Sequence, residues 1–327
     1  MKVTILGAGA WGSSLAKLLH ESGNEVTLWA HNAERLARLA QTGRNEPYLP
    51  DVQLPTDWTT EPDIHKAVAA AELVVIAVAS KAFRSVTRHL QDFDGIALTC
   101  TKGIEFDTGK TMSGILEQTM PKAKVAALSG PTLALEVARN IPAATVVASQ
   151  DEEAAKAIQG VFHRPTFRVY TSDDLQGVEM GGALKNVIAI AAGCGDGLGF
   201  GDNSKAALVT RGIVEMTRLG VASGAKRETF SGLSGIGDLV ATCYSSLSRN
   251  RTFGERLGRG EDLPQILFNT ANAAEGYHAA CSARQLAQKL KVPTPIINEV
   301  YAVLYEGKDA RSAVMDLTAR DAGAEGV

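Results

Sequence analysis

The sequence predicts an α/β fold followed by an all-α domain, and three observations support this prediction. Short apolar runs alternate with helical segments through the first half of the chain. Such runs stop after Ser172, and the remainder has the pattern of successive helices broken by glycine-rich stretches at 197–201 and 232–237. A chain of 327 residues is long enough for two domains. We therefore predict domains at 1–172 and 173–327.

The predicted strands share a run of apolar and β-branched residues bounded by turn residues. They are KVTILGA (2–8), EVTLWA (25–30), LVVIAV (73–78), IALTCT (96–101), KVAALS (124–129), AATVVAS (143–149) and FRVYTS (167–172). Because helical segments separate these runs, we expect a parallel sheet.

Composition and charge restrict the classes of partner. The 33 Lys and Arg residues are balanced by 36 Asp and Glu residues and form no basic block, so we expect neither nucleic acid nor an anionic membrane as a partner. Cys100, Cys194, Cys243 and Cys281 lie far apart without a metal-type spacing, which favours reduced thiols and no metal. The chain enters its first strand directly and holds no apolar run long enough for a bilayer. These features favour a cytoplasmic protein.

The clearest cofactor signal is the turn GAGAWG, which places Gly7, Gly9 and Gly12 between the first strand and the first helix. A Gly-x-Gly-x-x-Gly sequence alone is a weak signal. Between a strand and a helix it indicates dinucleotide binding, because the free amide groups and the dipole of the helix N-terminus favour a pyrophosphate. We therefore predict a Rossmann-like first domain.

The end of the second predicted strand bears on the choice between NAD and NADP. An acidic residue there would bind the ribose 2′-hydroxyl of NAD, but the residues are Ala30, His31 and Asn32. The missing acid removes the usual repulsion against a 2′-phosphate, and Arg35 lies just beyond. Two interpretations of Arg35 stay open, a contact to NADP or a solvated helix residue. We predict that both NAD and NADP serve as cofactors.

Two further turns follow predicted strands and should reach the carboxyl edge of the sheet, where open α/β sheets bind ligands. TKGIE supplies Lys102, and SGPTLALE supplies Gly130 and Thr132. Lys102 is either a surface loop lysine or, given its place directly after a buried strand, a ligand-binding residue.

The stretch GGALKNVIAIAAG at 181–193 places Lys185 and Asn186 in an otherwise apolar helix. Burying an ammonium costs several kcal/mol, on the order given by transfer measurements, unless it is paired or neutralised, so this pair suggests function. Gly181 and Gly182 precede it by about one turn, and they either permit close helix packing or leave that face open to a small ligand.

The segment FSGLSGIGDLVATCYSSLSRNRTFG at 230–254 adds polar residues in a glycine-rich setting: Asp238, Thr242, Ser248, Arg249 and Asn250. Asp238 is either a helix N-cap or a partner for a cation. Arg249 is either a solvated charge or an anion-binding residue.

Taken in order along the chain, these motifs resemble the NAD(P)-dependent glycerol-3-phosphate dehydrogenases of bacterial type. The resemblance covers nearly the whole chain and rests on GAGAWG, NEPYLP, TKGIE, SGPTLALE, GVEMGGALKNVIAIAAG, GIGDLVATC, SRNRTFG, AAEGY and VLYEGKDAR. It implies reversible hydride transfer between NAD(P)H and dihydroxyacetone phosphate, which yields sn-glycerol 3-phosphate for phospholipid synthesis. It also implies a homodimer.

The resemblance assigns roles to residues in both predicted domains. It implies that Lys185 is the proton donor or acceptor, and the chemistry of ketone reduction adds Asn186, Asp238 and Lys102 as the other predicted catalytic residues. It implies dinucleotide contacts for the three glycines of the turn and for Ala10, Trp11, His31, Lys102, Ala134, Arg249 and Glu275. The implied substrate contacts are Lys102, Gly130, Thr132, Lys185, Asp238, Ser248, Arg249 and Asn250. Position 10 is alanine where many members have a hydroxyl residue, so a side-chain contact to phosphate is lost there.

The implied chemistry explains why a charged residue would interrupt an apolar helix. Reduction of a ketone requires hydride on the carbon and a proton on the oxygen, so a proton-exchanging group must lie beside that oxygen. Lys185 can be this group, and Asn186 and Lys102 can polarise the carbonyl. Two alternatives stay open: another dehydrogenase with a Rossmann-like and a helical domain, of the hydroxyacid or 6-phosphogluconate type, and a nicotinamide-binding sensor without turnover. The SRNR segment favours a compact phosphate, and the Lys-Asn pair with Asp238 argues against a sensor.

Overall fold

Residues 1–102 and 110–178 form the first of two units in the computed structural model, which describes residues 1–269 and 275–319. Its eight-stranded sheet has the order β10-β9-β8-β7-β6-β1-β2-β5. The strands are β1 (Lys2–Leu6), β2 (Glu25–Trp29), β5 (Thr59–Thr60), β6 (Leu73–Ile76), β7 (Ile96–Thr99), β8 (Lys124–Ser129), β9 (Ala143–Ser149) and β10 (Phe167–Ser172). The order reverses at β1 and β6, which is the Rossmann arrangement that the sequence predicted.

Two features of the first unit differ from the prediction. Strand β9 runs antiparallel to β8, so the expectation of a wholly parallel sheet was wrong at this pair. A short connection with the five-residue helix α6 (Ala134–Ala138) joins the two strands. Strand β5 and the hairpin of β3 (Arg44–Asn45) and β4 (Leu49–Gln53) were not predicted, because they are short and lie in a segment with Pro50 and Pro55.

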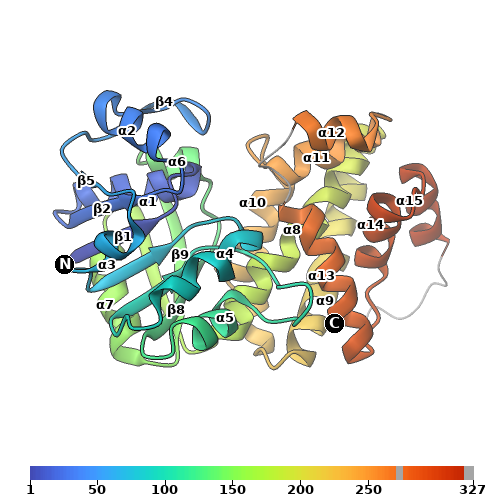
Figure 1. Ribbon diagram of the computed structural model, residues 1–327. Helices are drawn as coiled ribbons and strands as arrows, with labels where there is room; N and C mark the ends of the chain where they lie inside the picture. Colours follow the sequence, from blue (N-terminus) through green and yellow to red (C-terminus); the bar gives the residue numbers. More distant parts are fainter. Residues whose placement is uncertain (270–274, 320–327) are drawn as a thin grey trace. The chain divides into compact units, whose positions relative to one another are not determined.

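Both faces of the sheet are covered by helices (Figure 1). Successive residues of a strand enter opposite cores, as Val75 and Ile76 of β6 do. One face packs against residues of α1 (Ala10–Glu21), α2 (Ala33–Thr42), α6 and α7 (Glu152–Phe162). The other packs against α3 (Ile64–Val68), α4 (Ser80–Thr87), the 3₁₀ turn η1 (Arg88–Leu90) and α5 (Met112–Thr119).

The second unit contains residues 103–109 and the chain from 179 onward. Its described elements are helical, and they are α8 (Leu175–Gly197), α9 (Asp202–Ala222), the 3₁₀ turn η2 (Arg227–Ser231), the π-helix η3 (Leu233–Gly237), α10 (Asp238–Tyr244), α11 (Arg249–Gly258), α12 (Leu263–Asn269), α13 (Glu275–Leu290), α14 (Pro295–Tyr305) and α15 (Ala310–Thr318). This agrees with the predicted all-α domain.

The division between the units falls inside α8 rather than at the end of β10. Leu175 and Val178, in the first turn of α8, pack against Ala127 and Ala148 of the sheet, so this turn belongs to the first unit. The predicted boundary at 172 marks the end of the last strand. The assignment of a dinucleotide-binding domain to 1–172 and a substrate-binding domain to 173–327 stays a prediction.

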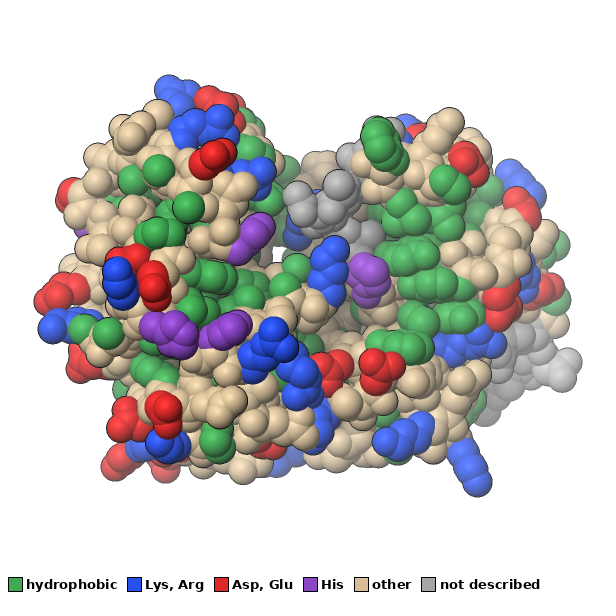
Figure 2. All heavy atoms as spheres, viewed as in Figure 1, with side chains coloured by type: hydrophobic (Ala, Val, Ile, Leu, Met, Phe, Trp, Pro, Cys, Tyr) green, Lys and Arg blue, Asp and Glu red, His purple; other side chains and the backbone are tan. Residues whose placement is uncertain are grey.

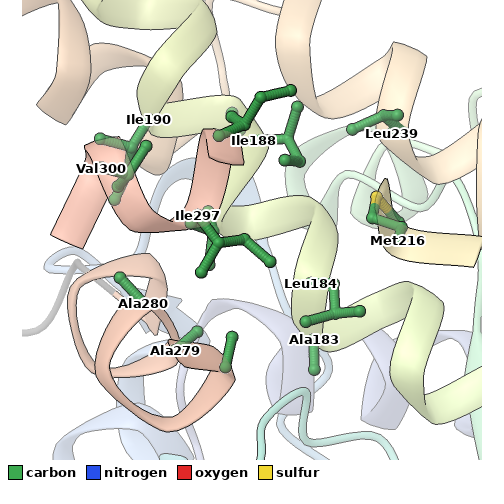
Figure 3. Packing of buried hydrophobic residues seen from close by; sticks show 14 of the residues in the cluster. Ala183, Leu184, Ile188, Ile190, Met216, Leu239, Ala279, Ala280, Ile297 and Val300 are labelled. Atoms are coloured by element: carbon green, nitrogen blue, oxygen red, sulfur yellow. The ribbon is translucent and has the colours of Figure 1, made fainter. Parts of the chain in front are cut away.

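Helix α8 is the central helix of the second unit. Every residue from 179 to 190 is buried, which explains why the sequence of this helix is mostly apolar, with Glu179, Lys185 and Asn186 as the exceptions in that range. Figure 3 shows Leu184 and Ile188 of α8 in the core that they share with Met216 of α9 and Leu239 of α10. A polar residue on α8 is therefore enclosed by protein.

Helices α8 and α11 approach closely through glycines on both sides. Gly193 and Gly197 of α8 meet the backbone of α11, and Gly254 and Gly258 of α11 meet the backbone of α8. A Cβ atom on Gly254 would lie 2.0 Å from the carbonyl oxygen of Ile190. This packing fixes the N-terminal end of α11 against α8.

The described surface carries charges of both signs. Figure 2 shows Lys and Arg side chains interspersed with Asp and Glu on each unit in this view. Among the described helices, none has the length and apolar character needed to span a bilayer.

Candidate active site

The glycine turn after β1 is shaped by two close backbone approaches. Gly7 has φ +117°, and a Cβ atom there would lie 2.6 Å from the carbonyl oxygen of Ala77, which follows β6. A Cβ atom on Gly12 would lie 1.8 Å from the carbonyl oxygen of Gly7. At Gly9, by contrast, a Cβ atom would meet nothing within 4 Å. The turn is therefore tight against the sheet and open at Gly9.

This geometry fits a dinucleotide. Gly9 is the N-cap of α1 and provides no side-chain cap, so the first amide groups of the helix keep their capacity to bind an anion. Ala10 and Trp11 begin the helix and are partly buried against the sheet core. The residues that the sequence predicted for the pyrophosphate are thus together at the switch point of the sheet.

Asn45 supports this turn and was not predicted as a site residue. Its buried Nδ2 donates to the carbonyl oxygen of Ala8 at 3.0 Å and to Oγ of Ser13 at 2.8 Å. The β3–β4 hairpin is thereby attached to the glycine turn. The only signal in the sequence was the position of Asn45 at the start of the NEPYLP motif.

The residues after β2 are placed where the ribose was expected. His31 is exposed, and Asn32 caps α2 through Oδ1, which accepts from the amide of Arg35 at 2.8 Å. The guanidinium of Arg35 lies over the ring of Tyr48, 5.8 Å from its centroid, and Nη1 donates to the Tyr48 hydroxyl at 3.3 Å. Arg35 is half-buried, and the structure leaves both interpretations of it open. Its contact to a 2′-phosphate stays a prediction.

Lys102, Gly130 and Thr132 lie together in the first unit. Nζ of Lys102 donates to the carbonyl oxygen of Gly130 at 3.4 Å, and Oγ1 of Thr132 donates to the same oxygen at 3.2 Å. Ala134, at the start of α6, accepts a hydrogen bond from Oγ of Ser14 on α1 at 2.8 Å. These two turns at the carboxyl edge are thus built as the sequence predicted.

Lys185 and Asp238 form a buried ion pair in the second unit. Their side chains are 8% and 2% exposed, and Nζ contacts Oδ1. Nζ also donates to Oγ1 of Thr242 at 2.7 Å. That hydroxyl in turn donates to the carbonyl oxygen of Asp238 at 2.6 Å. Thr242, to which the sequence gave no role, therefore acts as an acceptor for Lys185.

The π-helix η3 positions Asp238 for this ion pair. Asp238 is the first residue of α10, directly after η3, and the N-cap of α10 is Gly237, so the N-cap interpretation of Asp238 was wrong. The π-helix packs on α8 at Gly181, where a Cβ atom would lie 2.3 Å from the carbonyl oxygen of Ser234. Gly181 therefore serves close packing and is not open to a ligand. Single π-turns of this kind are frequent at functional sites.

Asn186 takes part in a second buried polar group. Its Oδ1 accepts from Nδ2 of Asn250 at 2.9 Å, and Oδ1 of Asn250 accepts from the amide of Gly276 at 3.0 Å. Nδ2 of Asn186 is buried and has no hydrogen-bond partner among the described residues. A buried donor without a partner costs about 1–3 kcal/mol, so this atom is a candidate ligand contact.

The remaining predicted residues lie at the starts of α11 and α13. Ser248 is buried and caps α11 through Oγ, which accepts from the amide of Arg251 at 3.2 Å. Arg249 is the first residue of α11 and is exposed. Glu275, the first residue of α13, is partly exposed. The structure thus gives Ser248 a capping function, and its substrate contact stays a prediction.

The buried cysteines are not suited to nucleophilic chemistry. Burial raises the pKa values of Cys194 and Cys243 to about 12 each, so both remain thiols near neutrality. Burial also raises the pKa of Cys100, despite the opposing charge of Lys102. A cavity of about 930 Å³ in the second unit is lined by other parts of α8, α9, α14 and α15 and does not include Lys185, Asp238 or Arg249.

A Rossmann-like unit with an open glycine turn, together with a helical unit that carries a buried Lys-Asp pair, defines a two-domain nucleotide-dependent dehydrogenase. Family models for the N-terminus and the C-terminus of NAD-dependent glycerol-3-phosphate dehydrogenase match residues 2–155 and 174–315. The chain belongs to this family.

Individual relatives agree with this membership. The chain is 47% identical over 331 residues to the glycerol-3-phosphate dehydrogenase [NAD(P)+] of Syntrophotalea carbinolica, with 99% of each chain covered. It is 48% identical to the enzyme of that name from Anaeromyxobacter sp. strain K, with 98% of each covered. The crystal structure of glycerol-3-phosphate dehydrogenase from Coxiella burnetii matches with a TM-score of 0.94 at 36% identity and covers 98% of this chain and 99% of that one.

Proposed function

We propose that this protein catalyses the reversible NAD(P)-dependent reduction of dihydroxyacetone phosphate to sn-glycerol 3-phosphate. Family membership supports this reaction over the hydroxyacid and 6-phosphogluconate alternatives, and the buried Lys185–Asp238 pair supports turnover over a sensor without chemistry. The product is a precursor of glycerophospholipids, and we propose that the protein supplies it for their synthesis.

The bound nicotinamide supplies the hydride, and the chain supplies position and proton. Lys185 gives a proton to the carbonyl oxygen during reduction and takes it back during oxidation. Asp238 and Thr242 hold Nζ of Lys185 in one position, so the ammonium is already oriented for proton transfer when the substrate binds. The Asp238 carboxylate also compensates the charge of the buried ammonium, which would otherwise be costly.

The other residues serve binding and polarisation. Nδ2 of Asn186 donates to the substrate oxygen on which charge develops. Arg249 stands at the N-terminus of α11, where the helix dipole also favours an anion, and binds the substrate phosphate with Asn250 beside it. In the first unit, Lys102 and Thr132 contribute further substrate contacts, and the glycine turn holds the dinucleotide.

The direct test follows NADH absorbance after addition of dihydroxyacetone phosphate and, in separate assays, after addition of each of a panel of 2-keto acids. We expect NADH to be oxidised with dihydroxyacetone phosphate and not with the keto acids. Oxidation only with a keto acid would contradict the substrate, and no oxidation with any of them would favour the sensor. Repeating the assay with NADPH tests the second coenzyme, which we expect to be accepted because His31 and Asn32 present no carboxylate to the 2′-phosphate.

We further propose a cytoplasmic location, on the basis of the dispersed cysteines and the absence of a long apolar run in the sequence, and a homodimer, on the basis of the family resemblance. The chain mass is 34.5 kDa. Light scattering coupled to size-exclusion chromatography should therefore give twice this mass, and a value equal to the chain mass would contradict the dimer.

A further inference from the structure

We propose that Asn250 is a positioning residue that fixes the orientation of the Asn186 side-chain amide and thereby presents its Nδ2 donor to the substrate oxygen. This inference rests on the proposed function. It goes beyond the phosphate contact implied for Asn250 by the resemblance.

The orientation of Asn250 is determined by a backbone group. The amide of Gly276 can only donate a hydrogen bond, so the atom of Asn250 that faces it at 3.0 Å must be Oδ1. The other atom of the same side chain is then Nδ2, which can only donate. An amide flip of Asn250 would place two donors against each other, so one orientation is selected.

The orientation of Asn250 in turn determines the orientation of the Asn186 side-chain amide. Nδ2 of Asn250 lies 2.9 Å from Asn186, so the atom of Asn186 that receives its hydrogen must be Oδ1. This leaves Nδ2 of Asn186, which is buried and has no partner among the described residues. Asn186 and Asn250 are only 3% and 7% exposed, so water competes poorly for these contacts.

The packing around Gly276 shows that this arrangement is tightly enclosed. A Cβ atom on Gly276 would lie 2.7 Å from the backbone oxygen of Asn186 and 2.8 Å from Oδ1 of Asn250. The glycine of the AAEGY motif thus lets the start of α13 approach both asparagines. Three segments far apart in sequence, on α8, α11 and α13, together determine which atom of Asn186 remains for a ligand.

The test uses Asn250→Asp, which keeps the size and shape of the side chain. One carboxylate oxygen still accepts from Gly276, but the other cannot donate to Asn186. Asn186 must then turn its amide so that Nδ2 donates to the carboxylate, and an acceptor replaces the donor that faces the substrate. We expect kcat/KM for dihydroxyacetone phosphate to fall at least about tenfold, because loss of one hydrogen-bond donor to a developing oxyanion costs up to roughly a hundred- to thousandfold.

A double-mutant cycle with Asn186→Ala separates this mechanism from others. If Asn250 acts through Asn186, then Asn250→Asp should cost less than about twofold more when Asn186 is already alanine. An undiminished loss in that background would overturn the proposal. Asn298→Asp, which makes the same chemical change at an exposed position of α14, is the matched control and should leave kcat/KM unchanged.

Dihydroxyacetone, which lacks the phosphate, separates positioning from charge repulsion. A new carboxylate could repel the substrate phosphate, but this effect disappears with dihydroxyacetone, whereas the loss at the carbonyl persists. Equal loss factors for both substrates support positioning, and a loss confined to the phosphorylated substrate overturns it. Thermal unfolding of each variant checks that the fold is retained. If the wild type failed to oxidise NADH with dihydroxyacetone phosphate, the proposed function itself would fail, which is a different result from an altered cycle.

Discussion

Lys185 and Asp238 illustrate how a buried charge is tolerated at the scale of single residues. An isolated ammonium in this core would be strongly unfavourable, but the carboxylate and the Thr242 hydroxyl replace the hydration of Nζ. Removal of the Lys185 ammonium or of the Asp238 carboxylate leaves the other charge buried and uncompensated. This dependence makes the pair sensitive to conservative substitutions.

We predict that Lys185→Ala lowers kcat by about a hundredfold or more, the usual scale for loss of a general acid-base group. NADH affinity, measured by fluorescence titration, should remain nearly unchanged because the glycine turn is intact. Lys185→Arg should fail as well, since a guanidinium does not release its proton in this range. Lys289→Ala, at an exposed position of α13, is the control. Near-normal turnover of Lys185→Ala would remove Lys185 from the mechanism.

We predict that Arg249→Ala raises KM for dihydroxyacetone phosphate strongly and also lowers kcat, because a remote phosphate contact helps to position the carbonyl. Dihydroxyacetone should be a poor substrate for the wild type, and the mutation should cost little more with it. Arg256→Ala, near the other end of α11, is the control and should have little effect. Equal losses with both substrates would instead assign Arg249 to the fold or the coenzyme.

The crossing of α8 and α11 shows how an element positions the site. Gly193 and Gly254 remove the side chains that would separate the helices, and this brings Asn250 within hydrogen-bond distance of Asn186. The glycines of α11 thus have a structural function one turn away from residues with a chemical one. Loss of the close approach should therefore affect stability and turnover together.

We predict that Gly254→Ala destabilises the protein by about 1–3 kcal/mol, the usual cost of overpacking, because the new Cβ atom would lie 2.0 Å from the carbonyl oxygen of Ile190. Urea unfolding measures the change in free energy, and kcat/KM should fall as Asn250 shifts. Gly160→Ala is the matched control, since a Cβ atom there meets nothing within 4 Å on the helix α7. That substitution should stabilise by about 0.5–1 kcal/mol. If Gly254→Ala and Gly160→Ala changed the free energy of unfolding by the same amount, the close approach of α8 and α11 would not be what makes Gly254 necessary.

The sequence predicted the main elements because each depends on local pattern. The seven apolar runs became β1, β2 and β6 to β10, and the helical region after Ser172 was correct. The direction of β9 was wrong because it depends on how the short segment after Gly130 packs, which strand composition does not encode. The π-helix η3 was not foreseen either, since glycines such as Gly232 and Gly235 suggest a loop.

The candidate site was predicted in its chemistry but not in its contacts. Lys185 and Asp238 were each recognised as unusual, yet their pairing joins α8 to α10 and follows from tertiary packing. Asn45 and Gly276 were missed because a lone asparagine or glycine carries no chemical signal by itself. Thr242 could have been found, since it lies one helical turn after Asp238 on the same face of α10.

At the scale of the whole molecule, the residues proposed for coenzyme binding and those proposed for proton transfer lie mainly in different units. The open glycine turn belongs to the first unit, and the Lys185–Asp238 pair belongs to the second. Coenzyme affinity and catalytic turnover should therefore respond to different substitutions, although the resemblance also implies coenzyme contacts for Arg249 and Glu275. A comparison of one variant in each unit, at positions other than Arg249 and Glu275, tests whether coenzyme binding and turnover depend on different units.

We predict that Gly9→Ala weakens NADH binding at least about tenfold, or ~1.4 kcal/mol, without lowering stability. Gly9 has extended backbone angles, and a Cβ atom meets nothing within 4 Å, so the free protein accommodates the methyl group. The same methyl group would stand where a pyrophosphate approaches the N-terminus of α1.

Asp238→Asn should do the opposite: NADH affinity stays within about twofold of the wild type, while kcat falls at least about tenfold because Lys185 loses its charge partner. Fluorescence titration and steady-state kinetics on both variants decide the question. If Asp238→Asn weakened NADH binding as much as Gly9→Ala, then the second unit would hold the coenzyme as strongly as the glycine turn does, and the division between the units would be wrong.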